Sequence, residues 1–123
     1  MIEETSILVI YTGGTIGMIA DKKSGALVPF NFDQINKQIP ELSRFNFRLD
    51  FHCFDPILDS SNMDPKVWIK LAHIIEYNYE EYDGFVVLHG SDTMAYTASG
   101  LSFLLENLNK PVVFTGSQLP LGV

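Results

Sequence analysis

Short runs of apolar residues recur along the chain, and each ends at a polar or glycine-containing turn. The runs cover residues 7–11, 48–54, 85–88 and 111–115. They are too short for helices and rich in β-branched and aromatic side chains, which is typical of strands buried in a sheet. The run at 48–54 alternates loosely between apolar and polar residues, and it still favours a strand. The pattern therefore predicts four strands.

A helical spacing of apolar residues appears between the second and third of these strands. Asp64 and Pro65 are typical of a helix start, with aspartate as the N-cap and proline at the first helical position. Apolar side chains then follow at intervals of three and four, which predicts an amphipathic helix over residues 65–82. The residues on its apolar face are Trp68, Leu71, Ala72, Ile75, Tyr79 and Tyr82.

A second helix is expected over residues 93–107, with Asp92 near its cap. Gly100 lies in its middle and costs about 1 kcal/mol relative to alanine. We expect Met94, Phe103 and Leu104 to belong to the core side of this helix.

Other segments lack a clear period. Residues 18–30 are polar and contain glycine, so we interpret them as a loop that covers the turn at residues 12–17. Residues 32–39 form at best a short helix that ends at Pro40. Neither an internal repeat nor a low-complexity segment occurs.

The order of strands, loops and helices indicates the fold class. A strand, a loop and a strand are followed by helix, strand, helix and strand, which is typical of an α/β fold with a doubly wound, mostly parallel sheet flanked by helices. The length of 123 residues fits one domain. In such a sheet the carboxyl ends of all parallel strands lie along one edge, where open α/β sheets bind their ligands.

Three hydroxyl-rich clusters follow the predicted strands and should therefore meet at this edge. They are Thr12 with Thr15, Ser60 with Ser61, and Ser91 with Asp92 and Thr93. Hydroxyl groups, a carboxylate and main-chain N–H groups suit a small polar substrate and acyl transfer through a serine or threonine nucleophile. The convergence of the three clusters is the strongest functional signal of the residue pattern.

The first cluster lies in a glycine-rich turn, Gly13-Gly14-Thr15-Ile16-Gly17. Glycines permit close approach of a ligand to the backbone, so this turn offers both a hydroxyl nucleophile at Thr15 and N–H donors for an oxyanion. The alternative is that Thr15 only caps the turn, because hydroxyl side chains favour turns. The spacing alone leaves both interpretations open.

Composition narrows the range of partners. Fifteen acidic residues against eight basic ones give a net charge of −7, which argues against nucleic acid or an anionic membrane as a partner. The acidic start of the chain is unlike a signal peptide, and no apolar run approaches the about 20 residues that a membrane-spanning helix needs. Cys53 is the only cysteine, which fits a reducing compartment. We expect a cytoplasmic protein.

Other chemistries have weaker support. His89 with Asp92 could act as a general base, but a hydrogen-bonded histidine at a strand end is the simpler interpretation. A metal site built from His52, His73 and His89 matches no common ligand spacing. The glycine turn matches neither nucleotide-binding pattern, and no G-x-S-x-G motif occurs. A threonine nucleophile needs a base, and none of the six lysines is well placed for this role: Lys22, Lys23, Lys37, Lys66, Lys70 and Lys110.

Three motifs in order resemble those of the type I, cytoplasmic bacterial L-asparaginases. They are residues 11–18 (YTGGTIGM), 59–63 (DSSNM) and 89–97 (HGSDTMAYT), and the resemblance extends to residues 104–108 and 115–120. It implies an amidohydrolase that converts L-asparagine and water to L-aspartate and ammonia. It further implies a threonine acyl-enzyme, no cofactor and a homo-oligomeric full-length form.

The resemblance also implies roles for individual residues. Thr15 would be the nucleophile, Ser60 would hold the substrate α-carboxylate and Asp92 its α-ammonium group. Ser91 would position and activate the water or the nucleophile. The catalytic residues would thus be Thr15, Ser91 and Asp92, and the residues around the substrate Gly14, Asp59, Ser60, Ser61, Gly90, Ser91 and Asp92. Without the resemblance, a lone carboxylate such as Asp59 is more typical of a turn residue than of an acid catalyst.

Three departures from the family pattern bear on activity. The family has threonine at the position of Ser91, so the hydroxyl remains but the methyl group that restricts its rotamer does not. A tyrosine that assists the nucleophile in many relatives has no counterpart near residues 25–27. The family continues beyond the position of Val123 and there carries the catalytic lysine and a second domain.

We therefore expect residues 1–123 to form a partial N-terminal asparaginase domain without the C-terminal domain, and to have negligible asparaginase activity alone. Two alternatives from other classes remain. One is a module that binds asparagine or aspartate without hydrolysing it. The other is a fragment that only associates with other copies or with a missing segment, because removing the second half of the fold would expose apolar surface.

Overall fold

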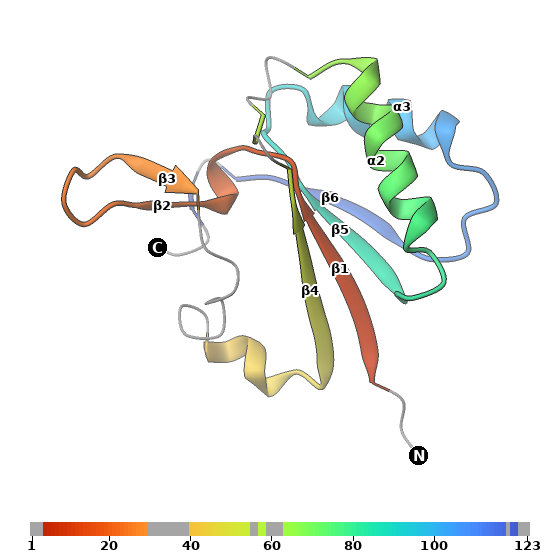
Figure 1. Ribbon diagram of the computed structural model, residues 1–123, viewed down its shortest axis with the longest axis horizontal. Helices are drawn as coiled ribbons and strands as arrows, with labels where there is room; N and C mark the ends of the chain where they lie inside the picture. Colours follow the sequence, from red (N-terminus) through yellow and green to blue (C-terminus); the bar gives the residue numbers. More distant parts are fainter. Residues whose placement is uncertain (1–3, 30–39, 55–56, 59–62, 118, 121–123) are drawn as a thin grey trace.

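A four-stranded parallel sheet forms the centre of the computed structural model, which describes residues 4–29, 40–54, 57–58, 63–117 and 119–120. The strands lie side by side in the order β4, β1, β5, β6 (Figure 1). Their bounds are Phe47–Cys53, Thr5–Tyr11, Gly84–Leu88 and Val112–Thr115, respectively. All four predicted strands and the mostly parallel α/β sheet are confirmed. The predicted helix at residues 32–39 lies outside the described residues.

The two α-helices of the described part of the chain pack against the same face of this sheet. Helix α2 (Pro65–Tyr77) and helix α3 (Met94–Leu104) also contact each other. The core between helices and sheet is closely packed, because Ile10, Leu71, Ile75 and Val87 have no exposed surface. The predicted N-cap is confirmed, since the Asp64 side chain accepts a hydrogen bond from the Val67 N–H at 3.2 Å.

The opposite face of the sheet is covered less completely. Val9, Tyr11, Ile16 and Leu88 form a second buried cluster, to which the 3₁₀ helix η3 (Pro40–Arg44) contributes Leu42. Val113 on the edge strand β6 remains 51% exposed. The described part of the chain therefore seals one face of the sheet and only partly seals the other.

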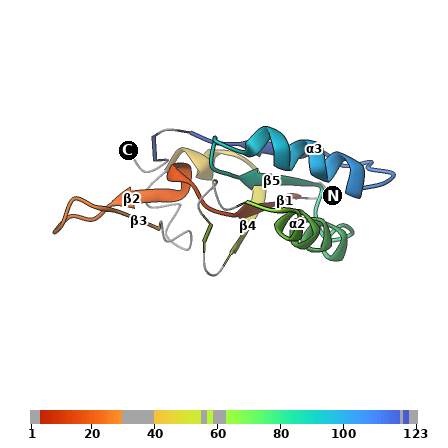
Figure 2. The ribbon, with the colours of Figure 1, turned by 90° about the horizontal axis from the view of Figure 1, so that it is seen from above.

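Residues 18–30 are not a plain loop, contrary to the expectation from their polarity. Strands β2 (Met18–Ala20) and β3 (Leu27–Pro29) pair antiparallel and form a hairpin. Its turn is stabilised by Asp21, whose carboxylate accepts hydrogen bonds from the N–H and hydroxyl of Ser24. The hairpin projects from the sheet on the side away from α2 and α3 (Figure 2).

Both helices are shorter than their apolar spacing predicts. Helix α2 ends at Tyr77 instead of residue 82. The side-chain amide of Asn78 donates to the Ile74 carbonyl at 2.8 Å and closes the last turn. Tyr82 is nevertheless buried in the core, as expected. Helix α3 ends at Leu104 instead of residue 107, and Asn107 has a positive φ of 56° that no helix continues.

The apolar side of α3 was also assigned wrongly in part. Phe103 is 86% exposed and Leu104 40% exposed, whereas Leu101 and Leu105 enter the core. Gly100 faces α2, where a Cβ atom would come within 2.4 Å of the Trp68 ring. Close packing between the two helices thus explains why glycine occurs at position 100 despite its low helix propensity.

The strand order places a switch point between β1 and β5. The chain leaves β1 toward β4 on one side of the sheet, and it leaves β5 toward β6 on the other. Adjacent connections that diverge in this way leave a crevice at the carboxyl ends of the two strands, where α/β proteins bind their ligands. Tyr11 and Leu88 pair in the sheet register, so the turns that follow them start at the same level.

Candidate functional site

The glycine turn after β1 lies at this switch point and is tightly packed against the backbone of neighbouring segments. Gly14 has a φ of +94°, a conformation that glycine adopts without strain. A Cβ atom on Gly13 would collide with the Leu58 carbonyl oxygen, at 1.8 Å. The buried Tyr11 hydroxyl donates to the Gly14 carbonyl at 2.7 Å. The turn therefore requires glycine and is supported by the last residue of its own strand.

The two threonines of this turn have different environments. Thr12 is fully buried, and its hydroxyl donates to the Leu88 carbonyl at 3.0 Å. The Thr12 hydroxyl, which the sequence groups with Thr15, is thus bonded to the neighbouring strand β5. Thr15 is half-buried at the first residue of the 3₁₀ helix η1 (Thr15–Gly17). The N-cap residue of η1 is Gly14, and no side-chain hydrogen bond caps this helix.

The loop after β5 lies directly against the glycine turn. A Cβ atom on Gly14 would be 2.7 Å from both the Cα and the nitrogen of Gly90. Ser91 and Asp92 follow and are exposed, and Thr93 is the N-cap residue of α3. The turn that carries Thr15 and the loop that carries Asp92 are thus neighbours at the carboxyl edge. Of the remaining residues expected around a substrate, Asp59, Ser60 and Ser61 lie outside the described residues.

His89, the residue before this loop, is fully buried. Its Nδ1 atom lies 2.6 Å from the Gly90 carbonyl oxygen, and its Nε2 atom lies 3.0 Å from the Thr97 hydroxyl on α3. Burial lowers the pKa of His89 below its ordinary value of 6.5. Both ring nitrogens are engaged, which supports the simpler interpretation of a hydrogen-bonded histidine over a general base.

Tyr11 and Thr97 are residues to which the sequence assigned no role of their own at the site. Burial, with a smaller effect of Cys53, raises the pKa of Tyr11 to about 12, so its hydroxyl keeps its proton as a donor to Gly14. The Trp68 indole donates to Thr97 at 3.1 Å. A hydroxyl residue on the buried side of a helix, as at Thr97, is the signal that could have indicated such a network.

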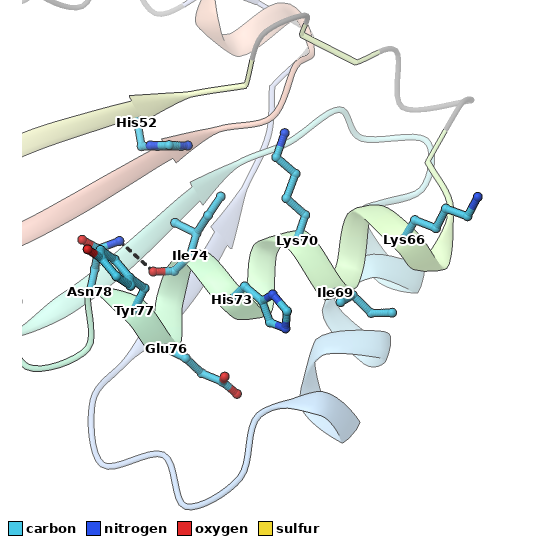
Figure 3. A pocket seen from close by; sticks show the side chains of 9 residues that line it. All are labelled: His52, Lys66, Ile69, Lys70, His73, Ile74, Glu76, Tyr77 and Asn78. Atoms are coloured by element: carbon cyan, nitrogen blue, oxygen red, sulfur yellow. Dashed lines mark hydrogen bonds between the residues drawn. The ribbon is translucent and has the colours of Figure 1, made fainter.

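A surface groove of about 970 Å³ lies elsewhere, between α2 and the edge strand β4 (Figure 3). His52 comes from β4, and Lys66, Lys70 and His73 come from α2. The groove is open, as the 91% exposure of Tyr77 on its rim illustrates. Its lining contains basic groups but no residue of the glycine turn or of the loop after β5, so this groove is separate from the switch point.

The described residues form neither a metal-binding cluster nor a membrane-spanning helix. Among residues 4–29, 40–54, 57–58, 63–117 and 119–120, no group of three or more histidine, cysteine, aspartate or glutamate side chains could hold a metal ion. The helices of that part of the chain are also not long and apolar enough to span a membrane.

At the switch point, the turn that carries the half-buried Thr15 hydroxyl lies against the loop that carries the exposed Asp92. These groups match the requirements of acyl transfer to a hydroxyl nucleophile, with N–H donors for the oxyanion. A carboxylate in the loop that contacts this turn suits a substrate that carries a positive charge. Such groups suit acyl transfer from a small, positively charged amide or ester.

Comparison with known proteins identifies similar chains. Residues 6–123 match the family model described as "Asparaginase, N-terminal". The chain is 50% identical over 121 residues to L-asparaginase 1 of Escherichia coli (strain K12), which covers 97% of this chain and 36% of that protein.

Two solved structures of asparaginases also resemble the fold. L-asparaginase I from Vibrio cholerae superposes with a TM-score of 0.80 at 46% identity, over 97% of this chain and 36% of that one. The thermostable L-asparaginase from Thermococcus kodakarensis superposes with a TM-score of 0.83 at 34% identity, over 95% of this chain and 35% of that one. The chain thus spans about a third of the length of these relatives.

Proposed function

Because this chain belongs to the asparaginase family through its N-terminal domain, we propose that it supplies the asparagine-binding half of an L-asparagine amidohydrolase. The reaction converts L-asparagine and water to L-aspartate and ammonia without a cofactor. In this proposal residues 1–123 are a partial N-terminal domain. Two further parts would lie in the portion of the relatives that this chain does not span. They are the lysine that activates the nucleophile and the whole C-terminal domain.

The proposed reaction begins at Thr15. Its Oγ1 attacks the side-chain carbonyl carbon of asparagine, and the backbone N–H groups of the glycine turn stabilise the resulting oxyanion. The proton lost by the Thr15 hydroxyl passes to the amide nitrogen, the C–N bond breaks and ammonia leaves, so that an ester between Thr15 and the aspartyl group remains. Water then hydrolyses this ester and regenerates the hydroxyl group.

The other residues orient the substrate. Asp92 binds the α-ammonium group, and Ser60 binds the α-carboxylate. Ser91 positions the water or the nucleophile, while Gly14, Asp59, Ser61 and Gly90 line the space around the substrate. The observation that carries the assignment is the backbone contact between Gly14 and Gly90, which brings the Thr15 turn and the Asp92 loop together at the switch point.

The proposal is tested by ammonia release from L-asparagine in the protein as its own gene encodes it. Thr15→Ala should lower kcat by about 10⁴-fold, which is typical for loss of one member of a catalytic unit. Thr5→Ala is a matched control, because Thr5 is an exposed threonine at the opposite end of β1. Equal activity of the two variants would reject Thr15 as the nucleophile.

The isolated 123-residue chain should show negligible asparaginase activity in the same assay, since the proposed lysine is not among its residues. A normal turnover number for this chain would contradict the division of the site between two parts of the enzyme.

A second candidate function is association without catalysis. It is favoured by the 86% exposure of Phe103 on α3 and the 51% exposure of Val113 on β6, because large exposed apolar side chains favour contact with another surface. In the proposed enzyme these surfaces would be covered by the rest of a cytoplasmic homo-oligomer. Light scattering that finds a monomer at high concentration would count against association.

A further inference from the structure

The buried ring of His89 joins the candidate site to both helices. It lies at the carboxyl end of β5 with no exposed surface, and each of its nitrogens has one partner. Thr97 on α3 is one partner, and this threonine also accepts the hydrogen bond of the Trp68 indole on α2. A chain of three hydrogen bonds therefore runs from α2 through α3 to the Gly90 carbonyl.

The chemistry of the partners determines the direction of each bond. A carbonyl oxygen only accepts, so the hydrogen between His89 and Gly90 resides on Nδ1. The ring is neutral, because burial lowers the pKa of His89, and its Nε2 atom accepts the hydroxyl hydrogen of Thr97. The indole N–H can only donate, so it donates to the Thr97 oxygen. Every member of the chain thus has the complementary partner it needs.

The Gly90 peptide at the end of this chain is the surface on which the glycine turn rests. A side chain on Gly14 would collide with the nitrogen and the Cα of Gly90, so the two backbones leave no space for rearrangement. The backbone N–H of His89 donates to the Thr115 carbonyl of β6 at 3.0 Å, which fixes the main chain before Gly90. Rotation of the Gly90 carbonyl is thus opposed by the bond from Nδ1.

We propose that His89 is a positioning residue, whose Nδ1–H holds the Gly90 carbonyl and so sets the distance between the Thr15 turn and the Ser91–Asp92 loop. This inference rests on the proposed function for its effect on catalysis, while its structural part stands independently. His89 does not exchange a proton with the substrate, since both of its ring nitrogens are occupied inside the protein.

Two substitutions separate the two ends of the ring. In His89→Asn the amide nitrogen is one bond from Cγ, as Nδ1 is, and can still donate to Gly90. In His89→Gln the terminal atoms reach the position of Nε2 and can still bond Thr97, but the donor to Gly90 is lost. Each variant thus keeps one of two buried hydrogen bonds, and both should lower the thermal unfolding midpoint by similar amounts.

The kinetic test uses the protein as its own gene encodes it, with kcat and KM for asparagine measured by ammonia release. His89→Asn should keep kcat/KM within about tenfold of the unchanged protein, and His89→Gln should lose a hundredfold or more. Equal losses in both variants, in proportion to their loss of stability, would mean that His89 only supports the fold and would overturn the proposal.

A spectroscopic test requires no variant and no activity. The ¹⁵N shifts of the His89 ring in the same protein should show the hydrogen on Nδ1, and a hydrogen on Nε2 would overturn the proposal. In amide spectra, His89→Gln should displace the signals of Gly14, Thr15, Ser91 and Asp92 more than His89→Asn does. If these spectra behave as expected while the unchanged protein does not hydrolyse asparagine, the positioning role stands and the proposed function fails.

Discussion

The glycine turn after β1 and the loop after β5 follow paired strands, but the surrounding structure holds them by different means. In both, a side chain near the strand end donates to a glycine carbonyl: Tyr11 to Gly14 at 2.7 Å and His89 to Gly90 at 2.6 Å. The first turn is otherwise held by shape, since its glycines contact the backbone of neighbouring segments. The second depends on a relay of side-chain hydrogen bonds through α3 to α2.

This difference matters because the two segments carry different kinds of residue. Thr15, the proposed nucleophile, is half-buried in the sterically confined turn, and a nucleophile needs a defined position. Asp92 is exposed in the loop, where a charged group retains its hydration. Changes of volume should therefore damage the first turn, and changes of hydrogen bonding should damage the second.

Gly14→Ala should have the largest effect. The new Cβ would lie 2.7 Å from the Gly90 backbone at a φ of +94°, so strain and overpacking together should lower the free energy of unfolding by about 3 kcal/mol. Gly25→Ala is the control, because Gly25 has a φ of +73° with no atom nearby and should cost about 1 kcal/mol. Denaturant titration measures both, and similar losses would contradict the steric account of the turn.

Thr97→Val should have the next largest effect, because it keeps the shape of the side chain and removes the centre of the relay. Leaving the Trp68 indole and His89 Nε2 without a partner should cost about 2 kcal/mol. Ser102→Ala on the same helix should cost less than about 0.5 kcal/mol, since that hydroxyl is exposed. A loss for Thr97→Val as small as that for Ser102→Ala would remove the relay from the explanation.

Tyr11→Phe should cost about 1 kcal/mol, less than the relay, because it removes one of several supports of the first turn. The exposed Tyr96 provides the control Tyr96→Phe.

The same substitution has a signature in pH. The unfolded state loses the Tyr11 proton near pH 10, whereas the folded state keeps it until the raised pKa of about 12. Stability should therefore fall as the pH rises between these values, and this part of the decline should be absent from Tyr11→Phe.

The smallest effect expected is the acid response of His89. Because burial lowers the pKa of His89 in the folded protein, the unfolded state binds a proton first as the pH falls below 6.5. The contribution of His89 to stability is thus complete above pH 6.5 and decreases as the pH falls toward the folded pKa. Unfolding free energies at several pH values should show this slope, and His89→Asn should lack it.

The strands and the core face of α2 could be predicted because they follow local patterns. Four apolar runs became the four strands of the sheet, and Leu71, Ala72 and Ile75 enter the core as their spacing indicates. The hairpin at residues 18–29 was missed because strands of three residues carry no periodic signal. The end of α2 was missed because Tyr79 and Tyr82 continue the spacing beyond the point where Asn78 caps the helix.

The sequence alone determined that two polar turns follow strands, one with Thr15 among glycines and one with Asp92 after Gly90. Such turns can be recognised because they are formed by residues that are adjacent in the chain. Their contact was decided by tertiary structure, since it needs the pairing of Tyr11 with Leu88 across the sheet. The same holds for Thr12 and His89, two polar residues at strand ends whose neighbours in the sequence do not reveal their roles. The Thr12 hydroxyl bonds to strand β5 and the Nε2 atom of His89 bonds to helix α3, and only folding brings such distant groups within bonding distance.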